Sequence, residues 1–128
     1  MQTPGLARIS NGKIIALDNC QPFLDILNKN AKKEGLEKSI TIKNQSMLEM
    51  NFKNASFYVI WSEGVLYFMG FQNGLIRCYQ LLKNKGYLVI TEALLLLSNI
   101  PNVLKKSWTQ EYPDIKDTKR NLKTMIFL

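Results

Sequence analysis

Residues 56–71, SFYVIWSEGVLYFMGF, decide the fold that the sequence predicts. The stretch begins with an apolar run at residues 57–61, whose β-branched and aromatic residues favour a strand covered on both faces. The run ends at Ser62-Glu63-Gly64, where a carboxylate lies between a small residue and a glycine. Ligands of open α/β sheets bind just outside the carboxyl ends of the strands. Two interpretations are possible: a core strand with an ordinary hydrophobic loop, or a strand that leads into a site. The side chains that would wall such a site are Tyr67, Phe68 and Phe71.

Strand and helix patterns alternate along residues 13–92. Apolar runs at residues 13–17 and 87–92 and the alternating SITIK at residues 39–43 predict three further strands. Pro22 suits the first turn of a helix after the first of these strands, and a second helical stripe runs from Leu75 to Leu82. The alternation predicts an α/β fold with a mostly parallel, doubly wound sheet of about four strands and flanking helices. The inward stripe of the first helix is expected to be Phe23, Leu24, Leu27 and Ala31.

Three of the four predicted strands end at an acidic residue, namely Asp18, Glu63 and Glu92. Because the carboxyl ends of parallel strands meet at the same edge of a sheet, these carboxylates predict a shared ligand site. The alternative is that a strand must end in something polar. Glu92 in particular reads equally well as an ordinary polar strand exit.

The composition excludes several classes of chemistry. The 128 residues contain no histidine, which removes the commonest general base and metal ligand together with Ser-His and Cys-His pairs. Cys20 and Cys78 lie far apart, so neither zinc nor thioredoxin chemistry is expected, and the site is predicted to hold no metal. The net charge is +7, but the basic residues are scattered. We therefore expect a solvated basic surface and no nucleic-acid partner.

The sequence also bears on location and organisation. The first residues, MQTPGLARIS, do not resemble a signal peptide, and the longest apolar stretch, residues 87–97, is interrupted by Glu92. That stretch falls short of the roughly 20 residues that a membrane span needs. We expect a cytoplasmic protein with no membrane partner. One domain is predicted over residues 1–128, with an N-terminal helix and turn at 1–12, an α/β core at 13–93 and a helical segment at 94–128.

Four segments in order resemble the Rossmann-like class I S-adenosylmethionine-dependent methyltransferases, especially the small-molecule enzymes related to quinone-biosynthesis methyltransferases. IIALDNCQPFLDIL is similar to the family's second strand, and NQSMLEMNF is similar to the loop after its third. FYVIWSEGVLYFMGF resembles the fourth strand, and LLKNKGYLVITEA the fifth. A further segment, IPNVLKKSWTQEYPDI, is similar to the segment after the fifth strand in one subgroup. The resemblance implies S-adenosylmethionine as cofactor and an unknown small molecule as methyl acceptor.

The resemblance also implies roles for particular residues. Asp18 would accept hydrogen bonds from the ribose hydroxyls, and such charge-assisted bonds are stronger than neutral ones. Asn19, Ser46 and Met47 would lie at the adenine, with the Met47 backbone N–H as one contact. Ser62 and Glu63 would face the methionine half and the acceptor, Glu63 being the catalytic candidate and, with Tyr67, an acceptor contact. Methyl transfer needs mainly alignment of the reacting atoms, so positioning requires no histidine.

The chain also departs from the family. It has no GxG, whereas the family's first strand leads into a glycine-rich turn, and NLKTMIFL ends before the family's last strands would appear. The resemblance therefore implies a methyltransferase truncated at both ends, without the strand that lies between those at residues 14–17 and 57–61. We expect these two strands to pair directly, or the chain to be unstable or to self-associate through exposed sheet edges.

Three functions remain open from the sequence. The first is a methyltransferase core acting on a small molecule, with reduced or no activity in this form, and the second is a non-catalytic fragment or protein-interaction module derived from one. The third, a basic nucleic-acid-binding domain, rests on the +7 charge alone and would require a steep salt dependence of binding.

Overall fold

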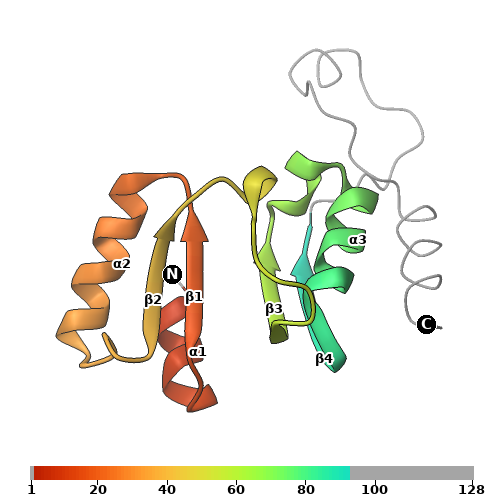
Figure 1. Cartoon of the computed structure of the whole chain (residues 1–128). Coiled ribbons are helices and arrows are strands. Elements are labelled where there is room, and N and C mark those ends of the chain that lie inside the picture. Colours follow the sequence, from red (N-terminus) through yellow and green to blue (C-terminus); the bar gives the residue numbers. More distant parts are fainter. Residues whose placement is uncertain (1, 93–128) are drawn as a thin grey trace. The chain divides into compact units, whose positions relative to one another are not determined.

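The computed structural model of the chain describes residues 2–92, which fall into two compact units divided between Asn51 and Phe52. Each unit is a two-stranded parallel sheet with helices packed against it (Figure 1). The predicted α/β fold with four parallel strands and flanking helices is confirmed. The first unit contains α1 (Thr3–Ser10), β1 (Ile14–Asp18), α2 (Gln21–Lys33), β2 (Ile40–Asn44) and the 3₁₀ helix η1 (Met47–Glu49). The second contains β3 (Phe57–Glu63), the 3₁₀ helix η2 (Leu66–Met69), α3 (Phe71–Leu81) and β4 (Leu82–Thr91).

In the first unit, β1 and β2 pair in parallel from Ile14 opposite Ile40 to Asp18 opposite Asn44. The core of this unit is formed by Ala7 of α1, two residues of α2 and Ile40 of β2. Helix α2 buries Leu24, Leu27 and Ala31, as predicted. Phe23, however, is 56% exposed, so its place in the inward stripe was wrong. Adjacent helical residues point about 100° apart, and the stripe that begins at Leu24 leaves Phe23 outside it.

In the second unit, β3 and β4 pair in parallel, and α3 and η2 cover one face of this sheet. The core cluster joins Leu66 of η2 to three residues of α3, with Ile60, Leu88 and Ile90 of the strands packed against it. The opposite face is exposed: Val59 is 53% and Trp61 45% accessible. The prediction that this strand is covered on both faces was therefore wrong, because an apolar run does not reveal how many layers pack on it.

Two further boundaries differ from the prediction. Strand β3 continues through Ser62 and Glu63, and β4 begins at Leu82, so residues 83–86 belong to a strand rather than to a helix end and turn. An irregularity in the pairing accommodates them, since Phe57 pairs with Leu82 but Val59 pairs with Tyr87.

Phe71 is 7% exposed and belongs to the core cluster, so it does not wall an open site.

The predicted direct pairing of residues 14–17 with 57–61 is not found in the sheets of residues 2–92, because β1 pairs with β2 and β3 with β4. Instability and self-association remain predictions. So do the single domain and its boundaries at residues 12 and 93. The predicted helical segment at 94–128 lies outside the described residues.

Candidate functional site

Asp18 is the last residue of β1, and local hydrogen bonds hold its carboxylate in place. Its Oδ1 accepts a hydrogen bond of 2.8 Å from the backbone N–H of Cys20, where α2 begins. The backbone oxygen of Asp18 accepts from Gln45 N–H at 3.0 Å, which ties the end of β1 to the residue after β2. Asp18 is half-buried, and its Oδ2 has no hydrogen-bond partner within residues 2–92. This oxygen is therefore available to a ligand.

The other residues predicted to bind the adenosine half lie at the same edge of the same unit. Asn19 directly follows β1 and is exposed, and Ser46 and Met47 follow β2, the strand paired with β1. The Ser46 hydroxyl accepts from Leu48 N–H at 3.2 Å and so caps η1. Met47 is the first residue of η1, where an N–H has no partner within the helix. The structure thus brings Asp18, Asn19, Ser46 and Met47 together at one sheet edge.

Ser62 and Glu63 end β3 in the second unit, and they point to opposite faces of its sheet because successive strand residues alternate. Ser62 is 8% exposed and lies on the face covered by α3 and η2, and its Oγ has no hydrogen-bond partner among the described residues. Glu63 is exposed on the other face, where its Oε1 accepts from the Trp61 indole N–H at 2.8 Å. The strand therefore does not place these two side chains together.

Glu92, which the sequence left open between a shared ligand site and an ordinary polar strand exit, makes a long-range contact. It follows β4 and accepts a 2.7 Å hydrogen bond at Oε1 from the backbone N–H of Leu66, the first residue of η2. Its Oε2 is buried and finds no hydrogen-bond partner in the described part of the chain. The sequence carries no signal for this contact, because the two residues are 26 positions apart.

Tyr67 is half-buried in η2, and its ring stacks on that of the exposed Phe68 with 4.2 Å between the ring centroids. Both residues belong to η2, which follows β3 in the chain, and their role as the wall of a site stays a prediction. The three strand-exit carboxylates divide between the units: Asp18 belongs to the first, while Glu63 and Glu92 belong to the second. Their assembly into one shared site stays a prediction.

Three other features of residues 2–92 concern metal binding, membrane spanning and the buried cysteine. No group of three or more His, Cys, Asp or Glu residues within residues 2–92 is placed to hold a metal ion. No helix of residues 2–92 is long and apolar enough to cross a membrane. Burial raises the pKa of the Cys78 thiol from 9.0 to about 11, although the neighbouring Arg77 charge lowers it. At neutral pH this thiol is protonated and is a poor nucleophile.

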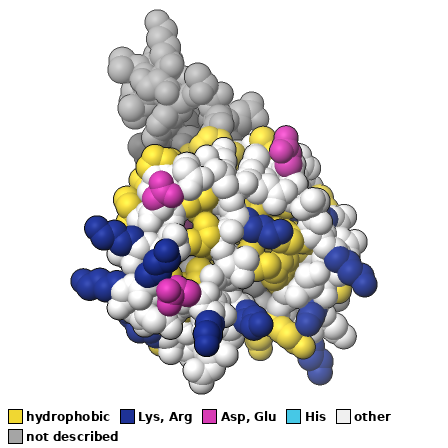
Figure 2. Space-filling model, turned by 60° about the vertical axis from the view of Figure 1, so that its left-hand side comes forward, with side chains coloured by type: hydrophobic (Ala, Val, Ile, Leu, Met, Phe, Trp, Pro, Cys, Tyr) yellow, Lys and Arg dark blue, Asp and Glu magenta, His cyan; other side chains and the backbone are white. Residues whose placement is uncertain are grey.

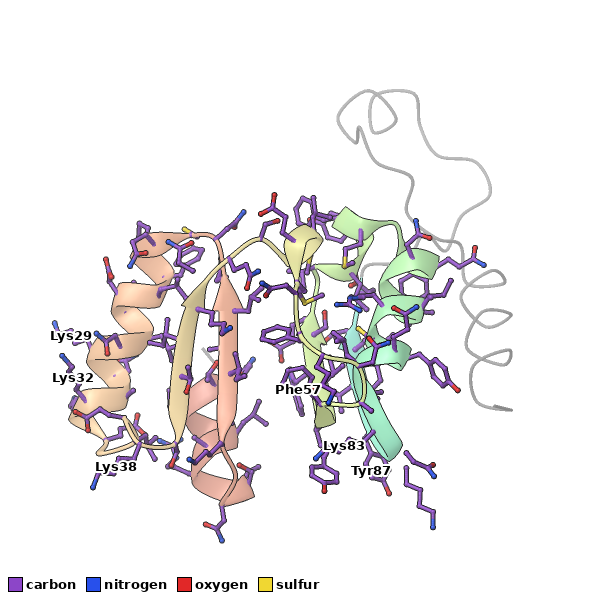
Figure 3. The ribbon with its side chains drawn as sticks, viewed as in Figure 1. Lys29, Lys32, Lys38, Phe57, Lys83 and Tyr87 are labelled. Atoms are coloured by element: carbon purple, nitrogen blue, oxygen red, sulfur yellow. The ribbon has the colours of Figure 1, made fainter. Side chains whose placement is uncertain are left out.

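A cavity of about 230 Å³ lies between α2 and β2, but none of the predicted site residues lines it. The basic side chains are spread over the surface: Lys29 and Lys32 project outward from α2, and Lys38 from the loop after it (Figure 3). Figure 2 shows the Lys and Arg side chains interspersed with uncharged and acidic surface.

Comparison with known proteins identifies the family. The sequence pattern described as "Methyltransferase domain" matches residues 1–90. The chain therefore belongs to the methyltransferase domain family. No curated protein matches it by sequence.

Two solved structures share the fold. The first, "[4+2]-Cyclase SpnF", matches with a TM-score of 0.76 and 16% identity over 96% of this chain and 45% of that one. The second, a putative sarcosine dimethylglycine methyltransferase from Galdieria sulphuraria, matches with a TM-score of 0.64 and 24% identity over 70% of this chain and 34% of that one. The chain thus spans less than half the length of either protein. At these identities the likeness shows the fold alone.

Proposed function

We propose that this chain is the core of an S-adenosylmethionine-dependent methyltransferase that acts on a small molecule. The family match supports the cofactor class. The observation that carries the proposal is Asp18, a carboxylate held at the end of a parallel strand with one oxygen fixed and the other available. This arrangement suits a ribose diol, which presents two hydroxyl donors to a carboxylate.

The donors and acceptors of the first unit fit the adenosine half of the cofactor. Asp18 Oδ2 would accept from the ribose, the Met47 N–H would donate to the adenine ring, and Asn19 and Ser46 would lie beside it. When bound, S-adenosylmethionine supplies an activated methyl group on a sulfonium. The chain would contribute alignment, with Glu63 and Tyr67 at the methionine half and the acceptor, while Ser62, whose side chain is buried beneath α3 and η2, would contribute only through its backbone. Glu63 remains the candidate catalytic residue.

Calorimetric titration with S-adenosylmethionine tests this proposal. The unmodified chain is expected to bind with a micromolar dissociation constant. Asp18→Asn keeps an oxygen for the Cys20 N–H and removes the charge, and it should weaken binding by about tenfold or more, since hydrogen bonds to charged groups contribute about 1.5–3 kcal/mol. Asp25→Asn makes the same charge change on the exposed face of α2, where Asp25 accepts from Gln21 at 2.7 Å, and should bind like the parent. Equal affinity of both variants would contradict the role of Asp18.

The second candidate is a non-catalytic interaction module, which two observations favour. Each strand of residues 2–92 pairs on one edge only, and unpaired strand edges readily pair with another chain. The exposed Val59 and Trp61 add apolar surface on β3. Sedimentation over a range of protein concentrations distinguishes the candidates: a monomer that binds S-adenosylmethionine supports the enzyme, whereas self-association without such binding supports the module.

A further inference from the structure

The segment that follows β3 is anchored by its first helical residue. Leu66 opens η2, and its N–H donates to Glu92 Oε1 at 2.7 Å, so that the end of β4 holds the start of η2. Tyr67 is the next residue along the chain. A carboxylate that accepts a backbone N–H makes a charge-assisted hydrogen bond, which is stronger than a neutral one.

The side chain of Leu66 supplies a second anchor. It is 2% exposed and lies against Gly74 of α3. A Cβ at position 74 would come within 3.1 Å of Leu66 Cδ2 and 3.3 Å of the Leu66 backbone oxygen, so the glycine allows this close approach. Gly64 and Gly70 flank the segment with φ of 61° and 75°. Glycine adopts these angles at no steric cost, so the glycines permit the path of the segment and the two anchors fix it.

Burial of the Glu92 carboxylate lowers the stability of the fold, so a purely structural role does not explain this residue. Within residues 2–92 its Oε2 is buried without a partner, and so is the Oγ of Ser62 at the end of the neighbouring strand. Leaving a buried acceptor unsatisfied destabilises the fold. An apolar side chain would continue the face that Ile90 and Leu88 form against η2 and α3. Because Glu92 accepts a hydrogen bond from the Leu66 N–H, we infer that it serves to hold η2 in place.

We propose that Glu92 is a positioning residue, which holds Leu66 and thereby places Tyr67 at the carboxyl end of β3, where the methionine half of the cofactor and the acceptor bind. This inference rests on the proposed function for the identity of the ligand. Glu92 acts through the backbone of η2 and does not itself touch the reacting atoms. In this proposal Tyr67 contacts the methionine half of the cofactor as well as the acceptor. Loss of the bond would therefore affect that half of the ligand and spare the adenosine half, whose predicted contacts lie in the first unit.

Calorimetric titration with two ligands distinguishes binding of the methionine half of the cofactor from binding of the adenosine half. S-adenosylmethionine carries both halves, whereas 5′-methylthioadenosine lacks the amino and carboxylate groups of methionine. Glu92→Ala is expected to weaken S-adenosylmethionine by about five- to tenfold and 5′-methylthioadenosine by less than about twofold. Glu92→Gln keeps an oxygen for the Leu66 N–H and should bind both ligands within about threefold of the parent. Equal weakening of both ligands by Glu92→Ala, or no weakening of either, would overturn the proposal.

Gly74→Ala provides an independent variant that leaves the carboxylate in place. Its Cβ would push on Leu66 from the α3 side, so it should reproduce the selective loss for S-adenosylmethionine even if Glu92→Ala fails to fold. Amide hydrogen exchange tests the anchor without any ligand: the Leu66 amide should exchange at least about tenfold faster in Glu92→Ala and within about threefold of the parent in Glu92→Gln. A parent that binds neither ligand refutes the proposed function. Unchanged exchange at Leu66 refutes the positioning role.

Discussion

Removing the Ser62 hydroxyl is expected to stabilise the ligand-free chain. Ser62 is 8% exposed, and its Oγ has no hydrogen-bond partner among residues 2–92, so burial of this hydroxyl is not offset by a hydrogen bond to these residues. An unsatisfied buried polar group costs about 1–3 kcal/mol. Ser62→Ala removes that cost, while the loss of one packed atom offsets at most about 1 kcal/mol of it. We expect the free energy of unfolding to rise by about 1 kcal/mol.

Urea unfolding measures this change. With a slope of about 1–2 kcal/mol per molar urea, a gain of about 1 kcal/mol moves the midpoint upward by about 0.5–1 M. Ser56→Ala is the matched control, because the exposed Ser56 hydroxyl donates to the Lys53 backbone oxygen at 2.5 Å. That variant should lose up to about 1 kcal/mol, so the two changes have opposite signs. A midpoint for Ser62→Ala below that of the parent would refute the reasoning, since it would mean that the hydroxyl is satisfied.

Two further predictions concern stability. Burial raises the pKa of Cys78 from 9.0 to about 11, so the stability it contributes is present below pH 9 and is lost as the pH rises towards 11. Urea midpoints are measured at about pH 8 and about pH 10.5 for the parent and for Cys78→Ala. The midpoint should fall more in the parent, by an amount that corresponds to at most about 3 kcal/mol of unfolding free energy. An equal fall in both proteins would contradict this prediction. Gly86→Ala would place a Cβ 2.9 Å from the Lys83 oxygen and 3.1 Å from the Tyr58 oxygen, and should destabilise by about 1–3 kcal/mol. Gly12→Ala is the control, because its Cβ would lie 3.6 Å from the Ser10 hydroxyl oxygen, an ordinary contact distance. Equal urea midpoints for Gly86→Ala and Gly12→Ala would contradict the prediction, since the backbone around Gly86 would then accommodate the Cβ without loss of stability.

Sequence patterns located the edge of the first unit well. An apolar run that stops at Asp18 marks a strand end, and the pairing of β1 with β2 then brings the residues after each strand together. Such information is local, because it depends on where an apolar run ends and on the parallel direction that a strand–helix–strand unit imposes. This pattern alone singled out Asp18, whereas Asn19, Ser46 and Met47 were predicted from the resemblance to the methyltransferase family, and their binding roles stay predictions.

The contacts of the second unit were harder to predict. Glu92 accepts a hydrogen bond from Leu66, which lies 26 positions earlier in the sequence. Whether a glutamate after a strand binds a backbone N–H or faces water depends on which distant segment packs beside it. Trp61 and Phe71 are both aromatic, yet Trp61 is 45% exposed and Phe71 only 7%. Trp61 lies on the face of the sheet that α3 and η2 leave open, whereas Phe71 is itself the first residue of α3 and belongs to the core cluster between helix and sheet. Hydrophobicity alone does not encode which side of the sheet the helices cover.

We propose that S-adenosylmethionine binds at the carboxyl ends of these strands. An NMR titration of the full chain with S-adenosylmethionine tests it residue by residue. We expect the largest amide shift changes at residues 18–19, 46–47 and 62–67, with those at 18–19 absent in Asp18→Asn. Shift changes confined to the α2–β2 cavity around Asn28 and Glu37, or no changes at millimolar cofactor, would contradict the claim.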